Sequence, residues 1–211
     1  MGRSVVTASN EYEAALHNRG IFPVVGVDEV GRGPLAGPVV ACAVVLPEGL
    51  VIEGVTDSKK LSEKRRGALA AVIKERALAY GFGVVEAEEI DRTNILQATT
   101  KAMAQAVLAV QASLGEALQY ALVDGDKLPD LPCPGEALVS GDSRCFLIAA
   151  ASIVAKVERD AMLGELHRMY PQYGFDRNKG YGTAAHREAI FEYGLCPAHR
   201  RTFTKFYSNS L

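Results

Sequence analysis

The chain lacks the features that mark several large protein classes. Its four cysteines include no pair at the spacing of a metal site or a redox motif. Its most prominent uncharged apolar run, Cys145–Ala155, is far shorter than the roughly 20 residues that span a bilayer. No apolar signal core precedes the charged residues Glu11 and Glu13. These absences predict reduced thiols, no membrane partner and a cytoplasmic location.

Internal repeats, low-complexity tracts and Gly/Ser linkers are also missing, so the 211 residues favour one folded unit. Hydrophobic residues make up 48% and charged residues 23% of the chain, which is typical of a globular protein. The net charge of −2 does not by itself suggest a nucleic-acid partner, but ten of the 23 Lys/Arg and only six of the 25 Asp/Glu lie from Arg144 onward. This asymmetry suits a protein that presents cations beside a group of carboxylates. Ordinary scatter of surface charge explains it equally well.

Runs of β-branched residues alternate with segments of helical periodicity, which predicts a mixed α/β layered fold. Strands are expected at residues 24–28, 39–46, 82–85, 121–123 and 137–139. Helices are expected at residues 11–19, 62–80, 95–114, 145–170 and 183–193.

Two adjacent acids, Asp28 and Glu29, end the first apolar strand and precede Gly31 and Gly33. Burying such acids is unfavourable unless a partner compensates their charge. Because side chains alternate along a strand, the two acids should point to opposite faces unless the backbone turns at this point. The glycines supply the freedom for such a turn. We expect both carboxylates to reach one centre; the alternative is that they only cap a hairpin.

Two further acids follow apolar segments. Asp124 follows the apolar segment 120–123 and precedes Gly125, and the ends of strands are where open sheets gather ligands. Asp142 is expected to open the long helix at an N-cap-like position, where simple capping is the alternative interpretation. Carboxylates suit Mg²⁺ or Mn²⁺, and the four histidines show no spacing typical of a zinc site.

Two other patterns imitate known motifs. Gly31, Gly33 and Gly37, with Asp57 twenty residues further on, resemble a dinucleotide fingerprint, but a strand pattern follows where that fingerprint requires a helix. Ser152 and Lys156 have the spacing of a Ser/Lys nucleophile pair, yet they lie among apolar residues of a helix. A phosphate or structural contact is the better interpretation of the lysine.

Six further sequence blocks follow the acidic segment in a characteristic order, and together they resemble the ribonuclease HII family from about residue 21 to 206. The blocks, with the acidic segment first, are Gly26–Val40, Asp57–Ser62, Leu122–Gly125, Gly141–Asp142, Ala150–Asp160, His167–Pro171 and Lys179–Tyr181. The related HIII branch has an extra N-terminal domain and a lysine in place of Arg32, so this chain resembles HII more closely.

The resemblance implies an RNase H-like mixed sheet flanked by helices, with a small helical C-terminal portion. It also implies hydrolysis of RNA in RNA–DNA hybrids and cleavage 5′ of single ribonucleotides embedded in duplex DNA, with 3′-hydroxyl and 5′-phosphate products. Carried over by position, the metal-binding and catalytic acids are Asp28, Glu29, Asp124 and Asp142. Two Mg²⁺ or Mn²⁺ ions are expected with substrate bound.

The resemblance also assigns substrate contacts. Gly31, Arg32 and Gly33 match the family segment that reads the ribonucleotide 2′-OH, the group that distinguishes RNA from DNA. Tyr181 matches the residue placed against the following sugar, although by itself it reads as a surface loop tyrosine. Lys59 and Lys156 are weaker candidates for phosphate contacts. The lysine at 156 can instead pair with Asp160 one helical turn away.

Three segments are expected: an N-terminal extension at residues 1–20 with a short helix, a catalytic domain at 21–206 and a tail at 207–211. The protein is expected to act as a monomer. Two rival functions remain, a nuclease of the same fold that cuts all-DNA duplexes and a module that binds hybrids without cutting them.

Overall fold

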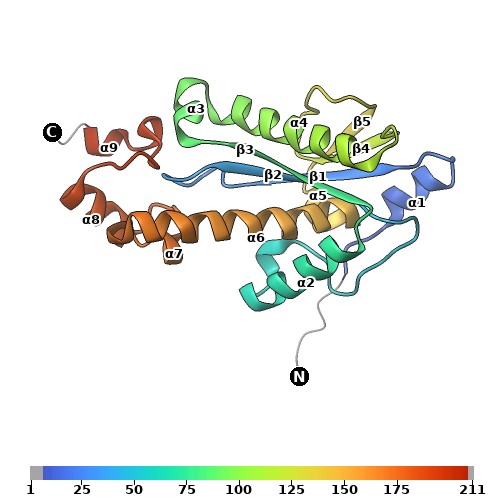
Figure 1. The fold of residues 1–211 in the computed structure, drawn as a ribbon, viewed down its shortest axis with the longest axis horizontal. Coiled ribbons are helices and arrows are strands. Elements are labelled where there is room, and N and C mark those ends of the chain that lie inside the picture. The colour runs from blue at the N-terminus through green and yellow to red at the C-terminus, as the bar shows by residue number, and fades with distance from the viewer. Residues whose placement is uncertain (1–6, 209–211) are drawn as a thin grey trace.

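A five-stranded sheet forms the centre of the computed structural model, which describes residues 7–208 (Figure 1). The strands are β1 (Val24–Val30), β2 (Val39–Val45), β3 (Ala79–Val85), β4 (Tyr120–Asp124) and β5 (Gly135–Leu138), in the spatial order β3-β2-β1-β4-β5. The β1–β2 and β2–β3 pairs are antiparallel, whereas β1–β4 and β4–β5 are parallel. Because β1 and β4 run in the same direction, their carboxyl ends meet at one edge of the sheet.

Helices cover both faces of this sheet, with α3 and α4 on one side and α2 and α6 on the other (Figure 1). The longer helices are α2 (Glu63–Arg76), α4 (Ile95–Leu114), α6 (Phe146–Met169) and α8 (Ala184–Tyr193). The shorter ones are α1 (Glu11–His17), α3 (Ala87–Arg92), α5 (Gly141–Arg144), α7 (Phe175–Asn178) and α9 (Lys205–Ser208), with 3₁₀ turns η1 (Ser58–Lys60), η2 (Pro171–Tyr173) and η3 (Arg201–Phe203).

The strands alternate their side chains between two hydrophobic cores. Val25 and Val27 of β1 pack in the core beneath α4, whereas Val24 packs in the core beneath α2 and α6. Gly26 allows α6 to approach the sheet closely, because an added Cβ would lie 2.4 Å from the carbonyl carbon of Leu147. Helix α6 is therefore packed directly against the strand that carries the first two acids.

A third, smaller core joins the C-terminal helices to the β1–β2 connection. Leu35 and Ala36 of that connection pack with Leu163, Phe175 and Ile190. Figure 1 shows the connection reaching the C-terminal helices at one end of the molecule. The prediction of a mixed α/β fold with a small helical C-terminal portion is confirmed.

Several predicted boundaries are wrong. The helix predicted to continue to Tyr80 ends at Arg76, because β3 already pairs with β2 from Ala79 onward. Helix α3 was not predicted, and β5 begins two residues before the expected strand. The backbone does not turn at the first two acids, since β1 remains paired with β2 as far as Val30. Asp142 does not open the long helix but lies in the separate short helix α5.

The N-terminal segment contacts the start of α6. The backbone N–H of Phe146 donates to the carbonyl of Ser9 at 2.9 Å, and that of Leu147 donates to the Glu13 carboxylate at 2.6 Å. Cys145, the N-cap residue, offers no side-chain cap of its own, so these contacts satisfy amides that a helix leaves unpaired. Across residues 7–208, no helix combines the length and apolarity needed to cross a membrane.

Candidate active site

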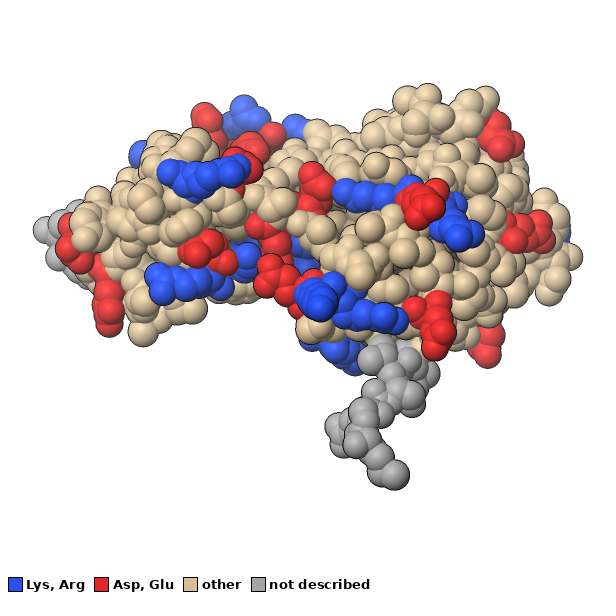
Figure 2. All heavy atoms as spheres, turned by 60° about the horizontal axis from the view of Figure 1, so that its bottom comes forward, with Lys and Arg blue, Asp and Glu red and all other residues tan. Residues whose placement is uncertain are grey.

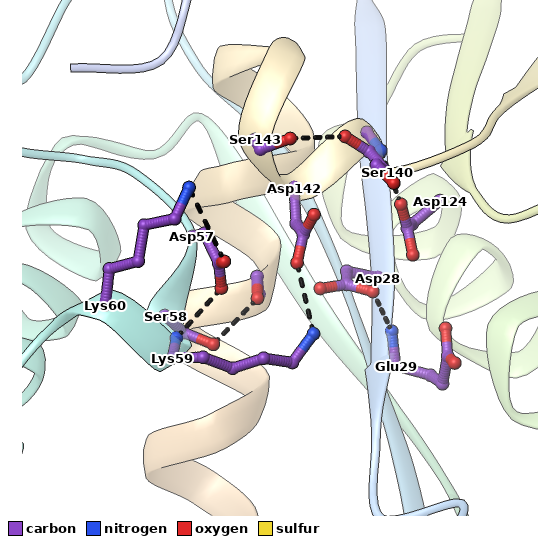
Figure 3. Close-up of polar contacts among 12 residues, drawn as sticks. Asp28, Glu29, Asp57, Ser58, Lys59, Lys60, Asp124, Ser140, Asp142 and Ser143 are labelled. Carbon is purple, nitrogen blue, oxygen red and sulfur yellow. Dashed lines mark hydrogen bonds and ion pairs between the residues drawn. The ribbon is translucent and has the colours of Figure 1, made fainter. Parts of the chain in front are cut away.

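Three carboxylates meet at the sheet edge where β1 and β4 end. One ligand oxygen from each of Asp28, Glu29 and Asp124 lies within 4.8 Å of the others, and we call this group the carboxylate cluster. Pairing of β1 with β4 extends to Val27 opposite Val123, so the acids come at the point where it stops. Figure 3 shows the three side chains on neighbouring elements at this edge. The strand stays extended here, so convergence needs no backbone turn.

Burial and mutual repulsion dominate the electrostatics of the cluster. Asp28 is only 5% exposed, and burial followed by the charges of Glu29 and Asp124 raises its pKa well above the usual range. Burial likewise raises the pKa of Glu29, although Arg32 opposes this shift. Burial and the charge of Asp142 raise the pKa of Asp124. An all-oxygen donor set that holds excess negative charge suits a hard divalent cation.

Asp142 lies beside the cluster and is engaged by a lysine. Its Oδ2 atom is 3.3 Å from the Lys59 Nζ atom (Figure 3). Helix α5 also contacts Asp124, because the backbone N–H of Gly141 donates to Asp124 Oδ1 at 2.6 Å. Although burial opposes it, the Asp142 carboxylate raises the pKa of Lys59. The structure thus brings Asp142 and Lys59 to the same site, with a cation beside the acids.

A hydroxyl pair connects the lysine segment to helix α6. Asp57 caps η1 through the backbone N–H of Lys59 at 2.9 Å, and Ser58 Oγ lies 2.9 Å from Ser152 Oγ. A hydrogen bond from Ser152 lowers the pKa of Asp28, against the larger effect of burial. Ser152 therefore belongs to the surroundings of the cluster, which its helical, apolar sequence context did not indicate.

The glycine loop after β1 and Tyr181 lie next to each other. An added Cβ on Gly33 would meet only Tyr181 Cε1, at 3.8 Å. The outer face of the loop is therefore open and is bounded by a tyrosine side chain that is half exposed. Arg32 is exposed and its Nη1 atom lies 3.4 Å from Glu29 Oε1, which connects the loop to the carboxylate cluster.

Lys156 is placed differently from Lys59. Its Nζ atom lies 2.5 Å from Asp160 Oδ1, one helical turn away, and Arg66 approaches the same carboxylate at 4.0 Å. The structure thus pairs Lys156 with an acid outside the carboxylate cluster, as the alternative interpretation of this residue expects.

Known proteins resemble this chain over most of its length. A family model described as Ribonuclease HII matches residues 25–207. The chain belongs to the ribonuclease HII family. It is 52% identical over 194 residues to a ribonuclease HII of Caldanaerobacter subterraneus subsp. tengcongensis, covering 92% of this chain and 79% of that protein. It is 56% identical over 180 residues to one of Dechloromonas aromatica, covering 85% and 90%.

The fold of this chain matches solved structures as well. The crystal structure of the ribonuclease H2 from Pyrococcus horikoshii OT3 has a TM-score of 0.70 and 29% sequence identity, and the match covers 88% of this chain and 97% of that one. Family membership makes the chain a ribonuclease H, an enzyme that acts on RNA–DNA hybrids.

Two buried arginines support the β1–β2 connection and the loop before Tyr181, and sequence analysis missed both. We call Arg159 and Arg200 the arginine support; each is 0% exposed. Arg200 donates to the carbonyls of Gly31, Arg32 and Gly37 at 2.6 to 3.0 Å. Its pKa is lowered by burial to about 9. Buried cations are normally paired with acids, but these donors bind backbone carbonyls.

Arg159 joins two loops that are far apart in the sequence. It donates to the carbonyls of Ala36 and Pro38 at 3.2 and 2.9 Å, and to that of Lys179 at 3.0 Å. Gly31 makes room for this side chain, because a Cβ there would lie 2.1 Å from Arg159 Nε, and its φ of +93° also favours glycine. Burial lowers the pKa of Arg159 to about 10. No local sequence signal marks these contacts, since a helical arginine usually reads as a surface residue.

Proposed function

We propose that this ribonuclease H is an endonuclease that cuts the RNA strand of RNA–DNA hybrids and also cuts 5′ of single ribonucleotides in duplex DNA. The products would carry 3′-hydroxyl and 5′-phosphate ends. The observation that supports this most is the open face of Gly33, bounded by the Tyr181 ring and connected to the carboxylate cluster through Arg32 and Glu29. A sugar bearing a 2′-OH can approach the backbone there, and the hydroxyl is the feature that separates RNA from DNA.

We propose that Mg²⁺ or Mn²⁺, two ions when substrate is bound, are held by Asp28, Glu29, Asp124 and Asp142. The crowded, buried carboxylates with raised pKa support this, because divalent cations relieve their repulsion. When bound, such ions supply activation of water and neutralisation of charge on the phosphate. The acids would hold the ions, and the lysine at 59 would contribute a nearby cation for the phosphate.

We also propose that Gly31, Arg32 and Gly33 meet the ribonucleotide and that Tyr181 packs on the following sugar. Figure 2 shows one face of the molecule on which acidic side chains gather near the middle with basic side chains on either side. Such a surface suits a phosphate backbone that passes cations on its way to an acidic centre. Residues 21–206 would form the catalytic domain, acting as a monomer in the cytoplasm, and the match over residues 25–207 supports this extent.

The decisive test uses a labelled DNA duplex that carries one ribonucleotide, incubated with and without Mg²⁺. The matched control is the same duplex with deoxyribose throughout. We expect one cut, 5′ of the ribonucleotide, only with the ion and only in the first duplex. A product that a DNA polymerase extends directly would demonstrate the 3′-hydroxyl end.

Two outcomes would favour the rival functions. Cleavage of the all-DNA duplex would indicate a nuclease of different specificity on the same fold. Binding of a hybrid that stays intact in Mg²⁺ would indicate a module that binds hybrids without cutting. The Asp124→Asn variant, assayed in parallel, separates the chain's own activity from a contaminating nuclease.

A further inference from the structure

Two histidines that are 13 residues apart in the sequence meet inside the C-terminal core. His186 on α8 and His199 before η3 are 0% and 3% exposed, and their Nε2 atoms lie 3.0 Å apart. The rings of Tyr173 and Phe175 enclose them, with centroid distances of 4.7 Å from Tyr173 to His199 and 5.4 Å from Phe175 to His186. We call this pair the histidine relay. It ends on the loop next to Gly33, because His186 Nδ1 lies 2.9 Å from the Tyr181 carbonyl oxygen.

The contacts determine where each proton of the relay lies. The backbone N–H of Cys196 donates to His199 Nδ1 at 3.0 Å, so that nitrogen accepts and the ring proton is on Nε2. His199 Nε2–H then donates to His186 Nε2, which leaves the second ring proton on Nδ1. His186 Nδ1–H donates to the carbonyl of Tyr181, which is an acceptor only. With one proton on each ring, every hydrogen bond of the relay has one donor and one acceptor, and all three donors point towards the Tyr181 carbonyl.

A metal site does not explain the pair. The Cys196 thiol lies 3.2 Å from His199 Nδ1, on the side of the ring away from His186. The thiol and the two facing Nε2 atoms therefore do not converge on one centre. Burial lowers the pKa of His199 to about 4 and also lowers that of His186, so both rings are neutral at pH 7 and the relay is complete.

We propose that His186 and His199 are positioning residues that fix the Tyr181 loop against the ribonucleotide-binding face. The inference rests on the role proposed above for Tyr181. The Tyr181 carbonyl accepts two bonds, from His186 Nδ1 and from the backbone N–H of Thr183 at 2.8 Å, and the Thr183 side chain caps α8 at the N–H of His186. The loop is thereby folded back on the first turn of α8 and tied to a rigid aromatic core. The Tyr181 side chain can then keep one position opposite Gly33.

The first test determines which ring nitrogens of His186 and His199 carry protons in the unaltered protein. Nitrogen-15 NMR at pH 7 should show His186 as the Nδ1–H tautomer and His199 as the Nε2–H tautomer, both neutral. Opposite tautomers, or a charged ring, would overturn the inference without any reference to activity. This measurement needs no variant, so the inference stays testable even where a substitution prevents folding.

The second test compares kcat/KM on a single-ribonucleotide duplex with kcat/KM on a long hybrid. His186→Phe keeps a ring in the core but removes the hydrogen bonds, and it should lower the ratio of the two values about three- to tenfold. His186→Asn can place an amide N–H near the position of Nδ1 and should restore most of the ratio. Ile190→Val, a fully buried change on the same helix with no bond to Tyr181, should leave the ratio unchanged.

Tyr181→Ala distinguishes failure of the inference from failure of the proposed function. We expect Tyr181→Ala alone to lower the ratio, and His186→Phe to add no further loss in that background. If Tyr181→Ala leaves the ratio unchanged, the proposed role of Tyr181 is wrong. If Tyr181→Ala lowers the ratio but His186→Phe does not, or if the two losses multiply, the relay does not act through Tyr181.

Discussion

The carboxylate cluster and the arginine support are both buried and charged, but they compensate their charges in opposite ways. In the cluster, like charges converge and burial raises the pKa of Asp28 and Asp124. In the support, Arg200 binds three backbone carbonyls, and burial lowers its pKa to about 9. The cluster is thus under electrostatic strain that a cation would relieve, whereas the support is already satisfied. The comparison separates a site built to bind a ligand from a site built to hold a shape.

The largest effect should come from removing one charge of the cluster. Asp28→Asn and Asp124→Asn should each abolish cleavage, because the amide keeps the shape but not the charge that would hold the ions. In the metal-free protein each should raise the melting temperature, since the change removes buried repulsion. Cleavage assays and thermal melts in a chelator measure the two effects, with the exposed Glu188→Gln as control. Near-normal turnover would show that these acids are structural.

Removing the support should act on stability in the opposite direction. Arg200→Met leaves the carbonyls of Gly31, Arg32 and Gly37 without their donors, at a loss of about 2 kcal/mol or more in the free energy of unfolding. Urea titration measures this loss. Arg168→Met, at a largely exposed arginine, should change the same quantity by less than about 0.5 kcal/mol. Equal stabilities of the two variants would mean that burial of the Arg200 cation offsets its hydrogen bonds.

Acid should reveal the same contrast. The pKa of His199 is about 4 in the folded state and near 6.5 when unfolded, so between these values the unfolded chain binds more protons and stability falls as pH decreases. Asp28 has a raised pKa, so its protonation on acidification favours the folded state. The free energy of unfolding against pH, measured without metal, should therefore fall less steeply below pH 6.5 in His199→Gln. In Asp28→Asn the free energy of unfolding should fall more steeply as the pH decreases, because the stabilising protonation of Asp28 is missing. Parallel curves for all three proteins would contradict both assignments.

The smallest effect concerns salt. Lys59 is largely exposed beside Asp142, and Lys59→Ala should flatten the slope of log affinity for a hybrid against log salt by about one unit. Lys156 was also predicted as a phosphate contact, but it is paired with Asp160. We therefore expect Lys156→Ala to change the slope less than Lys59→Ala does. Binding is measured in Ca²⁺ or with the Asp124→Asn variant, so that the hybrid stays intact. An unchanged slope for Lys59→Ala would remove that residue from the phosphate contacts.

Sequence patterns predicted the parts of the fold that depend on local periodicity. The β-branched run that forms β2 and the helical spacing of α4 were both recognised, and acids that follow apolar strands pointed to Asp28 and Asp124. The end of α2 was not predictable, because it depends on pairing of Val45 with Ala79. The arginine support and the histidine relay were also missed, since Arg159 is 121 residues away from Pro38 and local sequence carries no trace of that contact.

The contact of Glu13 with the first turn of α6 has a consequence for how the chain is made. Glu13 and Leu147 are 134 positions apart, so their bond can form only after residue 147 has left the ribosome. Until then the Glu13 carboxylate lacks this partner, because synthesis proceeds from the N-terminus. The order of synthesis and the order of assembly therefore differ at this point: Glu13 is translated long before the backbone amide that binds its carboxylate.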